Sequence, residues 1–163
     1  MQTPEGISLQ GSEAERLYRA HTGALICPRA ALGDADLEGY YVEVKKASST
    51  TINQVRAVKY IPLVIYRPHP ESWYVVPAHE VVRLVALKTR GQHSENPFES
   101  ATLSTKALEE FRVAPTELRE RTLDAVRESE ERPDLREAME EVLRACRELA
   151  DGSLARVRSV LLP

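Results

Sequence analysis

Two acidic side chains and one amine are spaced so that a short β-hairpin would bring them together. Residues 33–37 and 40–45 are typical of strands, and Glu38-Gly39 between them is typical of a two-residue hairpin turn. With this turn residue 34 pairs with residue 43. Asp34 and Glu43 then lie opposite each other on one face, with Cβ atoms about 5 Å apart. If the turn is longer, Asp36, which has the same parity, takes the place of Asp34.

Two carboxylates at that separation repel each other unless a cation lies between them. Mg²⁺ binds one or two carboxylates together with waters and phosphate oxygens, so Asp34 and Glu43 are candidate ligands for Mg²⁺ or Mn²⁺. Side chains alternate along a strand, so Lys45 lies on the same face, one residue pair beyond Glu43. Its ammonium is suited to hold a phosphate oxygen or to orient a metal-bound water.

The segments Gly33-Asp34 and Glu43-Val44-Lys45, joined by the short hairpin, resemble the core motif of the PD-(D/E)XK nuclease superfamily, which has the restriction-endonuclease-like fold. The closer likeness is to its Holliday-junction-resolvase-like and phage-type branches. Those branches place a helix with a metal-assisting glutamate before the first strand, and Glu15 in the segment 11–16 is the matching position. A polar residue often follows on the next helix, and Gln54 is the candidate.

This resemblance covers roughly residues 11–87 and implies a function. Asp34, Glu43 and Glu15 would hold the metal, and Lys45 and Gln54 would complete the catalytic set. The implied activity is Mg²⁺-dependent endonucleolytic hydrolysis of phosphodiester bonds in DNA, branched or structured DNA included, by a homodimer. Residues 88–163 are not explained by the resemblance.

The segments around the hairpin predict an α/β (α+β) fold. The pattern indicates a helix over 13–20, strands at 24–27, 60–67 and 73–76, a short helix from about 48 to 58 that carries Gln54, a helix after residue 77, and helices from 105 onward with a break at residue 152. We therefore predict a restriction-endonuclease-like core over 1–105, with a central mixed sheet flanked by helices. A helical C-terminal extension over 106–163 would pack on the core or on a partner.

Charge is unevenly distributed along the chain of 163 residues. The net charge is −3, yet residues 45–90 carry eight basic and two acidic side chains, a net charge of +6. Such a segment suits contacts to a phosphate backbone. With the nuclease activity that the resemblance implies, the expected partner is DNA rather than RNA. The candidate nucleic-acid contacts are Lys46, Arg56, Lys59, Arg67, Arg90 and, in a polar loop, His93.

Several classes of protein are excluded by composition. Cys27 and Cys146 are too far apart in sequence for a zinc motif or a disulfide scaffold, and the four histidines show no ligand spacing. The longest apolar stretch, residues 61–66, is far below the roughly 20 residues of a membrane span. With no secretory signal visible, a cytoplasmic location without membrane association is expected.

Two alternatives stay open from the residues themselves. Glu43 and Lys45 also fit an exposed ion pair on an edge strand, Asp34 a turn position beside glycine, and Glu15 a charge that stabilises a helix N-terminus. In that case the protein keeps the nuclease-like fold as an inactive nucleic-acid-binding module, or as a subunit that binds another protein through its helical tail.

Overall fold

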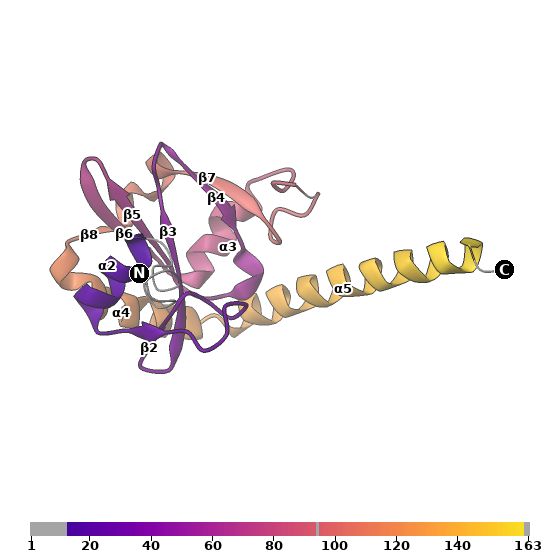
Figure 1. Cartoon of the computed structure of the whole chain (residues 1–163), viewed down its shortest axis with the longest axis horizontal. Helices are drawn as coiled ribbons and strands as arrows, with labels where there is room; N and C mark the ends of the chain where they lie inside the picture. The colour runs from indigo at the N-terminus through magenta and orange to yellow at the C-terminus, as the bar shows by residue number, and fades with distance from the viewer. Residues whose placement is uncertain (1–12, 94, 162–163) are drawn as a thin grey trace, which may run out of the picture.

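The computed structural model describes residues 13–93 and 95–161, with side chains as far as residue 147. These residues form a mixed α+β fold in which helices flank a mostly antiparallel central sheet (Figure 1). In chain order the elements are α2 (Glu13–Thr22), β1 (Leu25–Ile26), β2 (Ala35–Leu37), β3 (Tyr40–Lys46), β4 (Thr51–Val55), η1 (Ala57–Lys59), β5 (Leu63–Pro68), β6 (Glu71–Val76), α3 (Ala78–Ala86), β7 (Ala101–Ser104), η2 (Thr105–Phe111), β8 (Arg112–Val113), η3 (Pro115–Glu117), α4 (Leu118–Glu130) and α5 (Pro133–Leu161).

The central sheet has the strand order β1-β2-β3-β5-β6-β8. Neighbouring strands are antiparallel except β3 and β5, which are parallel with Glu43 opposite Leu63 and Lys45 opposite Ile65. Strands β4 and β7 form a separate two-stranded ribbon. The mixed sheet and flanking helices predicted from sequence are confirmed at this level.

Each face of the sheet packs against its own set of elements. One face buries Val42, Val44 and Val64 against Ala14 and Tyr18 of α2, together with α4. The other face buries side chains of β5 and β6 against α3, the β4–β7 ribbon and the start of α5. Because Val42 and Val44 face α2, the alternation of the strand turns the intervening residues of β3 to the opposite face.

The helix predicted between residues 48 and 58 is wrong. Residues 51–55 are strand β4, and only Ala57–Lys59 form a turn of 3₁₀ helix. Ile52 and Val55 are both buried although they are three residues apart, which is a helical spacing. In β4 the spacing arises because the pairing with β7 shifts between these two residues, a β-bulge that leaves Asn53 and Gln54 both exposed.

The segment beyond residue 105 contributes to the same hydrophobic core. Leu108, Leu118 and Ala125 are fully buried, and Met139 of α5 packs against residues of α3 and η1. The predicted break at residue 152 is wrong, because α5 is continuous from Pro133 to Leu161 and projects from the rest of the molecule (Figure 1). Over 13–93 and 95–161, no helix combines the length and the apolar character of a membrane span.

Candidate functional site

The hairpin that carries the acidic residues has the predicted register. Ala35 pairs with Val42, and Leu37 with Tyr40, around the two-residue turn Glu38-Gly39. Both turn residues have positive φ, 52° and 92°, as a type I′ turn requires. The carboxylate of Asp36 accepts the amide N–H of Gly39 and so closes the turn. Asp34, and not Asp36, is therefore next to Glu43.

Asp34 is held at its position by two backbone contacts. Its N–H donates to the carbonyl of Val42, and its Oδ2 accepts the N–H of Val44, each at 2.8 Å. Desolvation by burial, and then the negative charges of Glu43 and Glu15, raise the pKa of Asp34 to about 7, against the opposing effect of the Val44 hydrogen bond. The carboxyl group of Asp34 therefore keeps its proton to a higher pH than it would in water.

Glu43 keeps its negative charge because Lys59 neutralises it. The Nζ of Lys59 donates to Oε2 of Glu43 at 2.9 Å, and both side chains are about 15% exposed. Burial alone would raise the pKa of Glu43. The hydrogen bonds from Lys59 and Asp34, with the charges of Lys59 and Lys45, outweigh burial and lower it. Lys59, predicted from sequence as a phosphate contact, is therefore engaged with a candidate metal ligand.

Lys45 and Glu15 line one groove at the far end of β3. It has a volume of about 300 Å³ and also contains Lys46 and the backbone turn between β3 and β4. Lys46 forms an ion pair with Glu13 at 3.7 Å, which ties the strand to the first turn of α2. The structure therefore brings Glu15, Asp34, Glu43 and Lys45 into one region, with Asp34 and Glu43 in direct contact.

Gln54 lies apart from this region. It has a φ of 54°, its N–H donates to the side-chain oxygen of Gln92 at 2.6 Å, and it lines a separate pocket of about 290 Å³ with Arg56 and His93. Its neighbour Asn53 lines the groove of Lys45 instead. The β-bulge directs these two consecutive side chains to different surfaces. The helix predicted for this segment did not indicate such a separation.

The remaining basic candidates lie on different elements. Arg56 donates to the carbonyl of Glu99 at 3.1 Å beside the His93 loop. Arg67 lies near the end of β5, and Arg90 is exposed in the loop that follows α3. Of the six predicted nucleic-acid contacts, only Lys46 lines the Lys45 groove. Lys59 instead forms the ion pair with Glu43.

Sequence reasoning missed the ion pair between Glu43 and Lys59. Their contact depends on the parallel pairing of β3 with β5, which places the start of β5 beside Glu43. The available signal in the sequence was the position of Lys59, a basic residue directly before the predicted strand 60–67.

A metal centre made of three ligating side chains is not found in the part of the chain that the structure describes. No group of three or more His, Cys, Asp or Glu residues there has that arrangement. The donor set is the carboxylate pair Asp34 and Glu43, with the negative charge of Glu15 also acting on Asp34.

Comparison with protein-family models, with curated proteins and with solved structures found no match for this chain.

Proposed function

We propose that the protein is a metal-dependent nuclease that hydrolyses phosphodiester bonds of DNA. The observation that carries this proposal is the half-buried contact between Asp34 and Glu43 next to a groove lined by Lys45 and Lys46. A restriction-endonuclease-like assignment of the mixed sheet, the use of DNA as substrate and a homodimeric cytoplasmic form are parts of the same proposal.

The carboxylate pair fits Mg²⁺ or Mn²⁺ in its donor chemistry. Both ions prefer carboxylate oxygens, and burial together with the negative charges of Glu43 and Glu15 raises the pKa of Asp34. A divalent cation bound there would relieve this repulsion. When bound, the metal would polarise the scissile phosphate and lower the pKa of a water molecule.

The side chains of the chain itself have three roles in this proposal. Asp34 and Glu43 would bind the metal, with Asp34 oriented by the Val44 amide. Lys45 would stabilise the negative charge that develops on the phosphate, and Lys46 would hold the neighbouring backbone. Glu15 would contribute further negative charge from the first turn of α2.

A cleavage assay tests the proposal directly. Purified protein is incubated with plasmid, single-stranded and branched DNA in Mg²⁺ or Mn²⁺. We expect wild type to cleave at least one substrate. The cleavage rate should fall about 100-fold or more in Asp34→Asn, Glu43→Gln and Lys45→Met. Loss of a residue that only contacts a metal ligand typically lowers activity by about 10- to 100-fold, so a larger loss indicates a direct role. Glu71→Gln and Lys88→Met, exposed residues elsewhere, are the matched controls.

One observation favours a second candidate, an inactive DNA-binding module. Lys59 already neutralises Glu43, as a purely structural ion pair would. This candidate predicts that wild type binds DNA but cleaves none of the substrates, and that binding persists in Asp34→Ala and Glu43→Ala. Cleavage by wild type that these substitutions abolish would reject it.

A further inference from the structure

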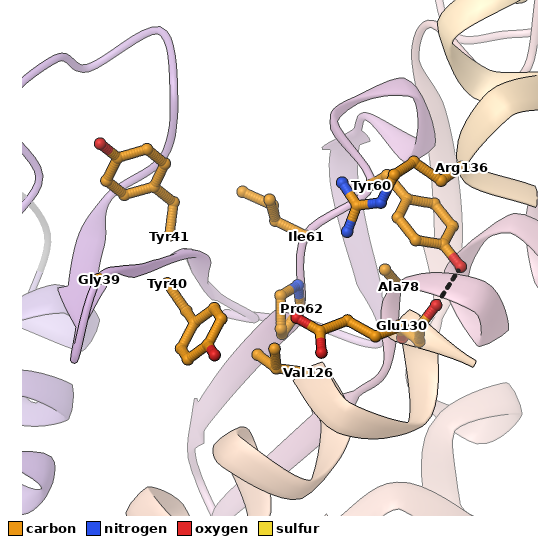
Figure 2. Close-up of a pocket in the computed structure, with 11 residues that line it drawn as sticks. Gly39, Tyr40, Tyr41, Tyr60, Ile61, Pro62, Ala78, Val126, Glu130 and Arg136 are labelled. Carbon is orange, nitrogen blue, oxygen red and sulfur yellow. Dashed lines mark hydrogen bonds between the residues drawn. The ribbon is translucent and has the colours of Figure 1, made fainter. Parts of the chain in front are cut away.

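A pocket rich in tyrosine lies at the opposite end of β3 from the Lys45 groove. It has a volume of about 180 Å³, and we call it the tyrosine pocket. Its lining includes Tyr40, Tyr41, Ile61, Pro62, Glu130 and Arg136 (Figure 2). These side chains come from the hairpin, the segment before β5, the end of α4 and the first turn of α5.

The tyrosine pocket is next to the carboxylate pair. Tyr41, Glu43 and Lys45 are alternate residues of β3, so they project from the same face at intervals of about 7 Å. Gly33 gives a second link, since a Cβ at this position would lie 3.2 Å from Cβ of Tyr41 and 3.4 Å from Cδ1 of Ile61. The wall of the pocket therefore touches the chain directly before Asp34, and the pocket, the acidic pair and the groove follow one another along β3.

The lining combines flat apolar surface with one cationic donor, Arg136, and one anionic acceptor, Glu130. Tyr40 is 43% exposed, and its ring points toward Pro62 and Val126 (Figure 2). Across the pocket, the Arg136 guanidinium lies over the Tyr60 ring at 4.9 Å from the centroid. The carboxylate of Glu130 extends into the space between Tyr40 on one side and the Arg136–Tyr60 pair on the other (Figure 2).

Tyr60 holds this arrangement in place. The residue is buried, has a φ of 50°, and its hydroxyl donates to the carbonyl of Ser129 at 3.0 Å. That bond joins the segment before β5 to the end of α4, so the two walls of the pocket are fixed relative to each other. A ligand would therefore meet a preformed site.

We propose that the tyrosine pocket binds one unpaired nucleobase of the nucleotide next to the phosphodiester bond that is cut. The inference rests on the proposed nuclease function and narrows its substrate to DNA with single-stranded nucleotides at the cut. A base is flat enough to stack on tyrosine, and its edge carries both acceptors for Arg136 and donors for Glu130. Fully paired bases are not available to such a pocket, because their edges and faces are already occupied.

Binding without catalysis tests this inference. Fluorescence anisotropy is measured in EDTA with the full chain, using a fluorescein-labelled single-stranded 20-mer and a fully paired duplex of the same sequence. We expect Tyr40→Ala and Arg136→Ala to weaken binding of the single strand at least fivefold, the lower end of the loss for one stacked base, and to change duplex binding less than twofold. Tyr40→Phe, which keeps the ring, should bind as wild type does.

Leu87→Ala and Arg127→Ala are the matched controls, since both side chains are exposed and neither lines the tyrosine pocket. Unchanged single-strand binding in Tyr40→Ala and Arg136→Ala, or an equal loss for both DNAs, would overturn the inference. A parallel cleavage assay with Mg²⁺ separates the two proposals. Cleavage by wild type with unchanged single-strand binding in the variants rejects the base site alone. Selective loss of binding in the variants without any cleavage by wild type rejects the nuclease alone. A wild type that neither binds nor cleaves DNA rejects both.

Discussion

At the scale of single residues, Asp34 and Glu43 are neighbouring carboxyl groups whose pKa values are shifted in opposite directions. Glu43 is paired with Lys59 at 2.9 Å, whereas Asp34 relies on one backbone amide and on a proton whose pKa is raised to about 7. An unneutralised buried carboxylate costs stability, and carboxyl pairs with shifted pKa values cluster at functional sites. The two predictions below probe this pair without relying on DNA.

Replacing Asp34 with asparagine should stabilise the metal-free protein in a pH-dependent way. The folded state raises the pKa of Asp34 above its unfolded value, so the stability that this proton contributes is complete below about pH 4 and is lost as pH rises to about 7. Thermal unfolding in EDTA should thus show Asp34→Asn gaining on wild type from pH 4 to 7, with a constant advantage above. The same gap at every pH would contradict the raised pKa. Glu71→Gln controls for the loss of one charge.

Replacing Lys59 with methionine should remove the ion-pair partner of Glu43 and leave its carboxylate available to bind a metal ion. We expect Lys59→Met to lose about 1–3 kcal/mol of stability in EDTA, because a half-buried carboxylate loses its partner. Removal of the competing ammonium should at the same time tighten Mn²⁺ binding roughly tenfold, measured by isothermal titration calorimetry. Lys88→Met, on an exposed surface, should alter neither quantity. Weaker Mn²⁺ binding in Lys59→Met would show that Lys59 supports the metal.

At the scale of elements, the hairpin was predictable and β4 was not. Glu38-Gly39 is a local signal, since two residues that accept positive φ fix the register of both strands and thereby place Asp34 beside Glu43. Strand β4 gave a misleading signal, because its bulge sets Ile52 and Val55 on one face at a helical interval.

Long-range contacts could not be predicted from sequence. The ion pair of Glu43 with Lys59 requires β5 to lie parallel to β3, and the tyrosine pocket requires the end of α4 to reach the segment before β5. Neither of these two contacts produces a hydrophobic periodicity that could be recognised in the sequence. The position of Glu43 and Lys45 on one face was predictable because side chains alternate along a strand.

The bulge in β4 predicts a contrast between adjacent positions. Gln54 has a φ of 54°, a conformation that a β-branched residue adopts at high cost, whereas Asn53 is not among the residues with positive φ. We expect Gln54→Val to lower the free energy of unfolding by about 1–2 kcal/mol and Asn53→Val to change it by less than about 0.5 kcal/mol. Urea denaturation at pH 7 measures both. Equal effects would indicate that the bulge is absent or lies elsewhere.

At the scale of the whole molecule, the first and last thirds of the chain share one core. Leu108, Leu118 and Ala125 are fully buried against elements that precede residue 105. The tip of α5, by contrast, projects from the rest (Figure 1).

Two truncations should therefore differ sharply. Removal of residues 106–163 strips large apolar side chains from both sides of the sheet, so we expect no cooperative thermal unfolding and loss of the near-ultraviolet circular dichroism of the folded state. Removal of 148–163 shortens only the projecting part of α5 and should leave the melting temperature within a few degrees. A cooperatively folded 1–105 fragment would instead establish the C-terminal extension as a separate unit, as a partner-binding tail requires.

The tie between α2 and α4 has a consequence for how the protein is made. Tyr18 donates to the hydroxyl of Thr122 at 2.9 Å, and Arg119 donates to the carbonyl of Thr22 at 2.6 Å. Helix α2, which carries Glu15, is thus anchored by residues synthesised about a hundred positions later. In a growing polypeptide, α2 and the acidic hairpin are synthesised early, and α2 gains these two contacts only after residues 119–122 have been made. The Lys45 groove, which Glu15 of α2 lines, would then take its final shape only after α4 has been synthesised.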